Sequence, residues 1–417
     1  MKIWLINQYN MPPEHGHLNR QFNFGKYLKR MGHEPTVFVG SFLHNTKIQM
    51  IKDDSLIKKY ANADYPYYFV KTCNYSFSKL KRIYAMFEFY NNLLKAIQSF
   101  ERPDVILGSS AHPLAAIAAI KLGEKYGCQS IVEVRDLWPE SFVAYGIISK
   151  NNPLLNILYA TEKWIYKNAD KLIFTMKGGK DYIIEQGWST EQGGPIDISK
   201  VHHINNGVDL EAFIYNKENY NFADEDLDNK KVFKIIYAGS IRLVNNIKSI
   251  VDAAYEIKKI GIEDIKFIIY GDGNDRKFLE RYCFENGIDN VIFKGFIDKK
   301  YIPYILSKSN LNIIHFEQNK LKKYGASLNK MFEYFASGKP TLSDCEFGYD
   351  LIKLYQCGVV IDNANAVEMA KEIVSIRNMS SLDYEKMCSN SLIAAKEFDF
   401  KNLASHLLEL IYTYNSN

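Results

Sequence analysis

Residues 324–340, YGASLNKMFEYFASGKP, predict a helix with a defined start and a defined end. Ser327 is a residue type that caps helix N-termini, because its hydroxyl accepts a hydrogen bond from a free backbone N–H. Gly338 suits the left-handed backbone that closes a helix. Helical spacing then places Lys330 and Glu333 on one face of the helix.

This pattern is suited to holding a nucleotide. A helix N-terminus attracts phosphate through free N–H groups and partial positive charge. Asn329 and Lys330 lie in the first turn, where Lys330 adds a full charge, and Glu333 can accept hydrogen bonds from ribose hydroxyls. The alternative is a surface Lys–Glu pair three residues apart, worth only about 0.2–0.5 kcal/mol.

Around this helix, apolar runs alternate with amphipathic helical stretches along most of the chain. Continuous apolar runs are typical of parallel strands buried on both faces, and strict alternation with helices predicts doubly wound α/β sheets. The expected strands are Lys2–Gln8, Thr36–Ser41, Asp104–Gly108, Ser130–Arg135, Lys171–Thr175, Val201–Ile204, Lys234–Ala238, Ile265–Tyr270, Val291–Lys294, Leu311–His315, Pro340–Leu342 and Val359–Ile361.

The pattern stops and restarts once, after the turn signal Asn206-Gly207-Val208-Asp209. At 417 residues, the length also favours two domains. We expect an N-terminal Rossmann-like domain at 1–205 and a linker at 206–232. A second Rossmann-like domain at 233–397 follows, and the final helix lies within 398–417.

Composition narrows the location and the partners. There is no long apolar run at the N-terminus, and the six cysteines show no metal or redox spacing, so a cytosolic protein with reduced thiols is expected. Residues 1–205 hold 25 basic against 18 acidic residues. This excess is compatible with an anionic lipid partner or with ordinary surface charge.

Several motifs together resemble one family, the retaining GT-B glycosyltransferases of family 4, over nearly the whole chain in order. They are Lys330 three residues before Glu333, Gly338-Lys339-Pro340, Gly32-His33 before Thr36-Val37-Phe38, Asn206–Asp209, Gly271-Asp272-Gly273 and Gly295-Phe296. The segment Glu133–Pro139 is similar to members that build bacterial capsule and O-antigen polysaccharides. The resemblance implies two Rossmann-like domains facing each other across a cleft.

The resemblance also implies a metal-independent transfer with retention of the anomeric configuration and no cofactor beyond the nucleotide sugar. Arg242 and Lys248 fall where the family binds the diphosphate, and fixed cations there would stabilise the charge of the leaving group. Ser327, Asn329, Lys330 and Glu333 are the other expected donor-binding residues. A second family glutamate is missing, because its position is Gly325.

In the first half, the loop with Gly16 follows the first strand. Glycine permits close approach of a ligand to the backbone, and His15, His17, Asn19 and Arg20 supply polar groups. The family often has a histidine at the position of His112 that contacts the donor sugar; a capping or packing role is the alternative. Asp136 ends a strand, where it could orient the acceptor or cap a turn.

The expected function is transfer of a sugar from a UDP-linked donor, such as an N-acetylhexosamine, to a lipid-diphosphate-linked saccharide. Capsule, O-antigen or lipopolysaccharide synthesis is the expected setting. Alternatives are a sugar-nucleotide 2-epimerase or a non-catalytic sugar-nucleotide-binding protein. Nucleic acid is not an expected partner. The basic, aromatic segment at 76–87 suggests peripheral binding to the inner face of the plasma membrane or, alternatively, a core helix with a solvated basic face.

Overall fold

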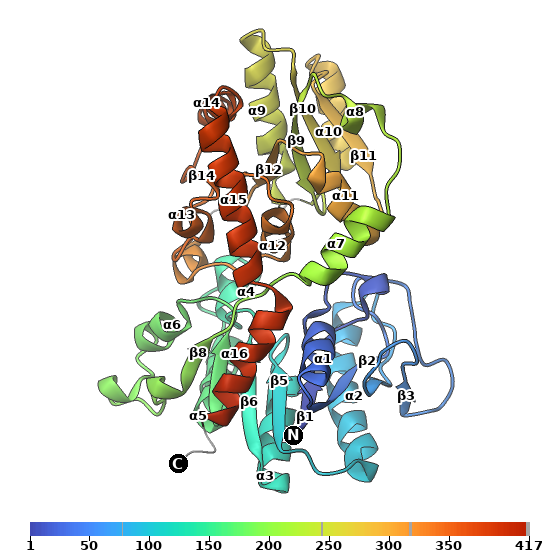
Figure 1. The fold of residues 1–417 in the computed structure, drawn as a ribbon. Helices are drawn as coiled ribbons and strands as arrows, with labels where there is room; N and C mark the ends of the chain where they lie inside the picture. Colours follow the sequence, from blue (N-terminus) through green and yellow to red (C-terminus); the bar gives the residue numbers. More distant parts are fainter. Residues whose placement is uncertain (77, 243–244, 317–318, 414–417) are drawn as a thin grey trace. The chain divides into compact units, whose positions relative to one another are not determined.

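The computed structural model describes residues 1–76, 78–242, 245–316 and 319–413, so Phe77 of the basic segment lies outside the described residues. The chain divides into two units, one formed by residues 1–205 with 400–417 and the other by residues 206–399 (Figure 1). Each unit is an α/β structure built on one sheet. That the two units face each other across a cleft stays a prediction.

The sheet of the first unit has the order β3-β4-β2-β1-β5-β6-β7-β8, in which only β3 is antiparallel. Its strands are β1 (Lys2–Ile6), β2 (Glu34–Gly40), β3 (Ile57–Lys59), β4 (Tyr67–Val70), β5 (Val105–Ser109), β6 (Gln129–Val134), β7 (Lys171–Phe174) and β8 (Val201–His203). β3, at the edge of the sheet, and its neighbour β4 were not expected, because both are very short and β3 has two lysines among its three residues.

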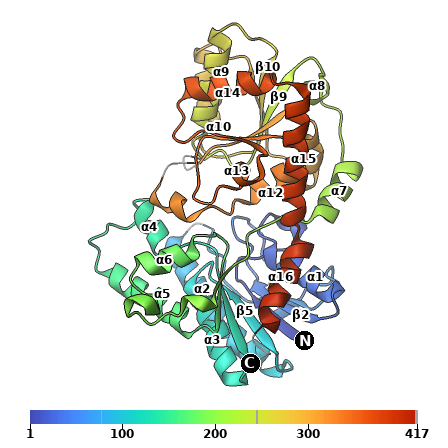
Figure 2. The same ribbon diagram turned by 60° about the vertical axis from the view of Figure 1, so that its left-hand side comes forward.

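Helices complete the first unit. They are α1 (Arg20–Arg30), α2 (Lys79–Ala96), α3 (Pro113–Tyr126), α4 (Glu140–Ala144), α5 (Leu154–Asn168), α6 (Gly179–Glu185) and α16 (Phe400–Tyr412). The terminal helix α16 lies beside α1, which both views show, and Phe400 meets Phe24 edge to face (Figure 2). The chain therefore ends on the unit in which it began.

The sheet of the second unit is wholly parallel, with the order β11-β10-β9-β12-β13-β14. Its strands are β9 (Phe233–Ala238), β10 (Ile265–Tyr270), β11 (Val291–Gly295), β12 (Leu311–Ile314), β13 (Thr341–Ser343) and β14 (Gly358–Val360). Its helices are α7 (Leu210–Asn219), α8 (Glu225–Asp228), α9 (Ile247–Lys259), α10 (Arg276–Glu285), α11 (Ile302–Ser307), α12 (Asn329–Ala336), α13 (Leu351–Tyr355), α14 (Ala366–Arg377) and α15 (Ser381–Glu397). The segment expected as a linker at 206–232 thus contains α7 and α8.

Strand order locates the ligand-binding edge of each sheet. In doubly wound sheets a crevice opens at the carboxyl ends of the strands where the order reverses. That reversal falls between β1 and β5 in the first unit and between β9 and β12 in the second. The central strands are apolar and buried on both faces, which anchors these edges on a rigid core; Ile3, Leu5, Ile236 and Ile313 are at most 1% exposed. Within the described residues, no helix is long and apolar enough to cross a bilayer.

Candidate functional site

Two glycine turns build the crevice of the second sheet. A Cβ on Gly271, where φ is +140°, would lie 1.7 Å from the carbonyl oxygen of Gly239, and a Cβ on Gly273 would lie 2.0 Å from that of Ile241. The turns after β9 and β10 therefore pack backbone against backbone, which only glycine permits. This contact fixes the loop that follows β9 at the edge of the crevice.

The helix predicted from residues 324–340 is present as α12, but it begins one residue later than Ser327 predicts. Leu328 occupies the N-cap position and makes no side-chain cap. The Ser327 hydroxyl accepts a hydrogen bond from the Asn206 backbone N–H at 2.9 Å, and Asn329 Oδ1 accepts one from Asn206 Nδ2 at 2.5 Å. The capping role expected for Ser327 is wrong, because a residue distant in the sequence binds its hydroxyl.

Lys330 lies beside the carboxyl end of β9, where a phosphate could reach it. Its Nζ donates to the Tyr237 hydroxyl at 3.0 Å and lies 4.5 Å from the centre of that ring. A Cβ on Gly239 would lie only 3.1 Å from the same Nζ. Burial lowers the pKa of the Lys330 ammonium to about 8, and the nearby Glu333 carboxylate opposes that shift.

Glu333, one turn further along α12, has a partner that the sequence did not predict. Lys299 Nζ lies 3.1 Å from Glu333 Oε1, and Lys299 follows β11, on the far side of β9 from β12. Both side chains are partly exposed, so the pair remains accessible to a ligand. The carboxylate can accept hydrogen bonds from vicinal hydroxyls while the ammonium balances its charge.

The two other expected phosphate ligands differ in their surroundings. Arg242 is exposed on the loop after β9, two residues beyond Ser240. Lys248, in the first turn of α9, is ion-paired with Asp252 at 2.7 Å and lies 4.5 Å from the centre of the Tyr282 ring. Asp252 therefore already holds Lys248 on the flank of its helix, an interaction that sequence spacing alone did not reveal.

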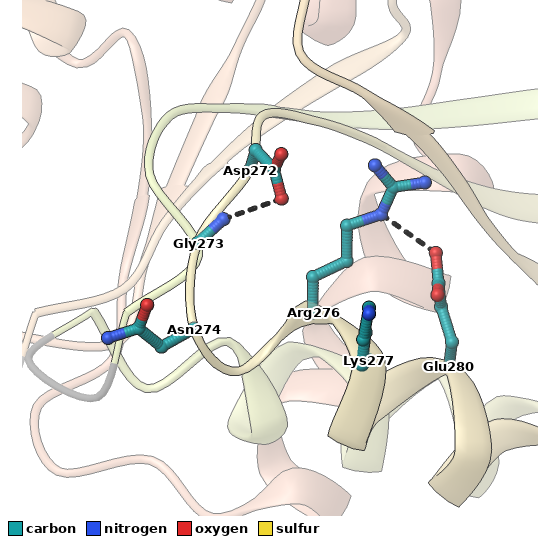
Figure 3. A pocket seen from close by; sticks show the side chains of 6 residues that line it. All are labelled: Asp272, Gly273, Asn274, Arg276, Lys277 and Glu280. Atoms are coloured by element: carbon teal, nitrogen blue, oxygen red, sulfur yellow. Dashed lines mark hydrogen bonds and ion pairs between the residues drawn. The ribbon is translucent and has the colours of Figure 1, made fainter. Parts of the chain in front are cut away.

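A polar pocket of about 480 Å³ adjoins the second glycine turn. It is lined by Asp272, Gly273, Asn274, Arg276, Lys277 and Glu280 (Figure 3). The Arg276 Nε donates to Glu280 Oε1 at 2.8 Å across the start of α10. The pocket thus places a paired cation and carboxylate at the same end of the sheet as the crevice.

Residue 325, where the family glutamate is missing, has a backbone conformation that favours glycine. Gly325 has a φ of +94°, a backbone that disfavours other residues, and it ends the 3₁₀ turn Lys320–Tyr324. Another polar pair, His315 and Asp344, lies just beyond the ends of β12 and β13. Sequence reasoning missed this pair, although His315 is the last residue of one predicted strand and Asp344 comes two residues after another.

In the first unit, His112 lies at the reversal between β1 and β5. It occupies the N-cap position of α3 but makes no side-chain cap, and neither ring nitrogen has a hydrogen-bond partner among the described residues. Burial, aided by the Arg82 charge, lowers the pKa of His112 to about 3. At neutral pH its ring is therefore uncharged, so one nitrogen can donate a hydrogen bond and the other can accept one.

The loop with Gly16 follows β1 and so borders the same reversal. A Cβ on Gly16 would lie 2.6 Å from the Met11 sulfur, so the loop is closely packed there. Arg20, expected as a polar group of this loop, instead begins α1 and is 2% exposed. Its predicted contact with a ligand is wrong, because its guanidinium is used inside the unit.

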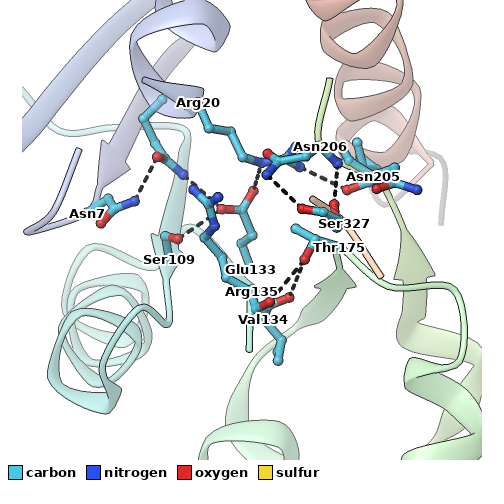
Figure 4. Close-up of polar contacts among 12 residues, drawn as sticks. Asn7, Arg20, Ser109, Glu133, Val134, Arg135, Thr175, Asn205, Asn206 and Ser327 are labelled. Atoms are coloured by element: carbon cyan, nitrogen blue, oxygen red, sulfur yellow. Dashed lines mark hydrogen bonds and ion pairs between the residues drawn. The ribbon is translucent and has the colours of Figure 1, made fainter. Parts of the chain in front are cut away.

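A buried network surrounds Arg20 (Figure 4). Its Nε donates to Glu133 Oε2 at 2.6 Å, and its terminal nitrogens donate to the carbonyls of Ile204 and Asn205. Burial alone would raise the pKa of Glu133, but Arg20 and Arg135 outweigh it and hold that pKa below its usual value. The network ties α1 and β6 to residues 204 and 205, where the chain leaves the first unit.

The other acidic residues to consider are Asp136 in the first unit and three clustered aspartates in the second. Asp136 is exposed just after β6, and burial raises the pKa of its carboxyl above the usual value although Arg135 opposes this. Asp224, Asp226 and Asp228 form two overlapping Asp-x-Asp patterns. Asp224 caps α8 and pairs with Lys294, which also pairs with Asp226, whereas Asp228 pairs with Lys308. These three carboxylates therefore have structural partners.

Comparison with known proteins identifies the two halves. The Glycosyltransferase Family 4 model matches residues 19–212, and the Glycosyl transferases group 1 model matches residues 220–391. A curated relative, the "Probable glycosyltransferase WbjE" of Pseudomonas aeruginosa, is 22% identical over 263 residues. That match spans 63% of this chain and 62% of the relative.

Solved structures share the fold along the full length. Sucrose-phosphate synthase from Thermosynechococcus elongatus is 15% identical, with a TM-score of 0.71, over 100% of this chain and 99% of that one. Anabaena HepE in complex with UDP-glucose is 15% identical, with a TM-score of 0.65, over 99% and 100% of the two chains. The prediction of two doubly wound domains of the GT-B fold is confirmed.

Proposed function

We propose that this chain, a glycosyltransferase of the GT-B type, moves a sugar from a nucleoside-diphosphate donor to a lipid-diphosphate-linked saccharide with retention of configuration. The observation that carries the proposal is the position of Lys330 and Glu333. Both residues project from α12 beside the β9–β12 reversal. The Lys330 ammonium lies next to Gly239 and the Glu333 carboxylate lies one helical turn away, an order that matches a diphosphate joined to a ribose.

In this proposal Lys330 binds the diphosphate and stabilises the charge that develops on the leaving group. Arg242 supplies a second cation from the loop after β9. While Lys248 is paired with Asp252, its positive charge acts on the diphosphate only at a distance, from α9. It binds phosphate directly only after that ion pair has opened. These cations would stabilise the leaving group without a metal ion.

Glu333 accepts hydrogen bonds from the ribose hydroxyls, and Lys299 holds its carboxylate in place. Ser327 and Asn329 act on the donor indirectly, because they bind Asn206 and so fix the start of α12. A UDP-linked donor, such as a UDP-N-acetylhexosamine, is the preferred assignment. Its support is HepE, which shares this fold and whose structure is of a complex with UDP-glucose.

The first unit supplies the acceptor side in this proposal. His112, neutral and without hydrogen-bond partners among the described residues, lies at the β1–β5 reversal and is assigned, as expected from the sequence, to hydroxyls of the donor sugar. Asp136 is placed after β6 to orient the acceptor, and Gly16 lets the loop after β1 approach the substrate. Because the Glu133–Pro139 segment resembles capsule and O-antigen enzymes, we assign the acceptor to that polysaccharide class.

Acceptor-dependent release of nucleoside diphosphate tests the proposal. We expect the purified protein to release UDP from a UDP-sugar only when a lipid-diphosphate saccharide is added, with the sugar recovered on the lipid. Interconversion of UDP-sugars without acceptor would instead establish the 2-epimerase alternative. Binding of UDP-sugars without either reaction, across a panel of acceptors, would establish a non-catalytic binding protein.

An exposed apolar stripe on α2 supports a membrane-bound site of action at the inner face of the plasma membrane. Leu80, Ile83, Tyr84 and Phe87 are 79%, 50%, 61% and 52% exposed, and their spacing places them on one face of the helix. Residues of the opposite face, such as Phe89, are buried. An apolar helix face with basic flanks binds the surface of anionic bilayers.

The basic residues on α2 are not equivalent. Lys79, Lys81 and Arg82 are all exposed, but Arg82 Nε also donates to the Tyr9 hydroxyl at 3.2 Å and its guanidinium lies 5.2 Å from the centre of that ring. The two lysines are therefore the side chains that we assign to lipid headgroups. Arg82 is assigned to the packing of α2 on the first unit.

We expect the protein to float with vesicles of anionic phospholipid and much less with vesicles of neutral phospholipid. Replacing Leu80 and Phe87 by serine should abolish flotation, and replacing Lys79 and Lys81 by alanine should remove the preference for anionic vesicles. The same apolar-to-serine change at Leu382 and Ile393, exposed on α15, is the matched control. Equal flotation of all variants would end the membrane assignment.

A further inference from the structure

The buried His315–Asp344 pair lies at the β9–β12 reversal and has no role in the assignments above. The His315 Nδ1 is hydrogen-bonded to Asp344 Oδ2, and the two residues are 9% and 4% exposed. Because a carboxylate only accepts, Nδ1 carries the proton in this bond. The other ring nitrogen, Nε2, is buried without a hydrogen-bond partner in the part of the chain that the structure describes.

Strand order places this pair at the same sheet edge as the Lys330 ammonium. β12 is the neighbour of β9 and is paired with it at Leu311 and Asn312, so His315, which follows β12, and Gly239, which follows β9, leave the sheet at the same edge. A Cβ on Gly239 would lie 3.1 Å from Lys330 Nζ. Since neighbouring strands are about 4.8 Å apart, the imidazole and the ammonium border the same crevice.

The order of the groups along the edge indicates which part of the donor meets His315. Glu333, the proposed ribose ligand, pairs with Lys299, which follows β11. Lys330, the proposed diphosphate ligand, lies at β9, and His315 lies on the opposite side of β9 from β11. A nucleotide sugar bound along this line extends its sugar, the group beyond the diphosphate, towards β12 and β13.

We propose that His315, oriented by Asp344, contacts the donor sugar by accepting a hydrogen bond from one of its hydroxyls at Nε2. The inference rests on the proposed function and adds a specificity residue to it. It also supplies an acceptor in a site where position 325 is glycine and offers no carboxylate. A buried nitrogen without a partner is costly in the free protein, and a sugar hydroxyl satisfies it.

The test separates the sugar from the nucleotide. Calorimetric titrations of the full chain compare UDP with UDP-glucose, UDP with UDP-N-acetylglucosamine, and GDP with GDP-mannose, on wild type, His315→Phe and His315→Gln. We expect His315→Phe to keep the affinity for the diphosphate and to lose about tenfold for its sugar form. His315→Gln, which can place an acceptor near the same point, should lose less than about threefold.

Asp344→Ala should behave like a weaker His315→Phe, and Asp344→Asn, whose amide oxygen still accepts from Nδ1, should restore sugar binding. Equal losses for the diphosphate and its sugar form would assign His315 to phosphate or to pocket shape and overturn the inference. Unchanged affinities in His315→Phe would overturn it too, with the proposed function intact. A wild type that binds no nucleotide in the panel defeats the proposed function and this inference together.

Discussion

The Lys330→Ala variant is expected to lose about 100-fold or more in kcat/KM for the nucleotide sugar. The lost ammonium is the fixed cation nearest the β9–β12 reversal, and removal of one such preorganised group typically costs two to three orders of magnitude. Glu333→Ala should lose about 10- to 100-fold, because a carboxylate that accepts ribose hydroxyls makes charge-assisted hydrogen bonds. Steady-state kinetics and titration with UDP measure both losses.

A second readout is the pH dependence of UDP binding. The Lys330 pKa is lowered to about 8 in the free protein, so the ammonium that binds the diphosphate is lost as the pH rises through about 8. The affinity for UDP should therefore be highest below pH 8 and fall above it. Lys330→Arg, which keeps its charge at high pH, should remove this fall.

The matched control is another Lys–Glu pair with the same spacing. Lys259 and Glu256 on α9 are three residues apart, with Lys259 Nζ 2.6 Å from Glu256 Oε1, and they lie at the opposite end of the helix from Lys248. Alanine at either position should leave donor kinetics unchanged. Wild-type turnover in Lys330→Ala and Glu333→Ala would refute the assigned pocket, and equal losses in the α9 variants would reveal a general folding defect.

The Arg20→Met variant is expected to destabilise the first unit by about 3–5 kcal/mol, because it leaves a carboxylate buried without its cation. Glu133 is 0% exposed and Arg20 is 2% exposed, so water cannot replace the lost partner. The variant also removes the donors to the Ile204 and Asn205 carbonyls. Urea unfolding measures the loss.

Fluorescence isolates this unit, since the four tryptophans, at positions 4, 138, 164 and 188, all lie in residues 1–205. Arg20→Met with Glu133→Leu should recover much of the lost stability, because it removes the unpaired charge together with its partner. Arg102→Met, which removes an exposed hydrogen bond to the Gly127 carbonyl, is the control and should cost under about 0.5 kcal/mol. An Arg20→Met cost as small as the control would contradict a stabilising role for the network.

Local pattern was enough to predict most of the architecture. Strands such as Lys234–Ala238 and Ile265–Tyr270 are continuous apolar runs between amphipathic helices, and the structure forms β9 and β10 there. The glycines at 271 and 273 were also informative, since the structure uses them where two backbones meet. By contrast, β3 and β4 went unpredicted because, at three and four residues, they are too short to show a clear apolar pattern.

For the candidate site, the sequence indicated which strand ends carry polar groups but not which groups meet. The positions of Lys330 and Glu333 on one face of α12 follow from helical spacing alone. Their partners, Tyr237 and Lys299, come from other strands and loops and carry no local signal.

By itself, then, the sequence determined the two series of strands and helices and the chemistry at the carboxyl ends of the strands. Hydrophobic periodicity and turn residues can be read within short stretches of chain, so they determine local structure without the tertiary fold. Only the tertiary structure decided that Ser327 binds Asn206, that Arg20 is buried against Glu133, and that His315 is held by Asp344. Such hydrogen bonds join residues far apart in the chain, and their geometry exists only once the sheets have ordered their strands.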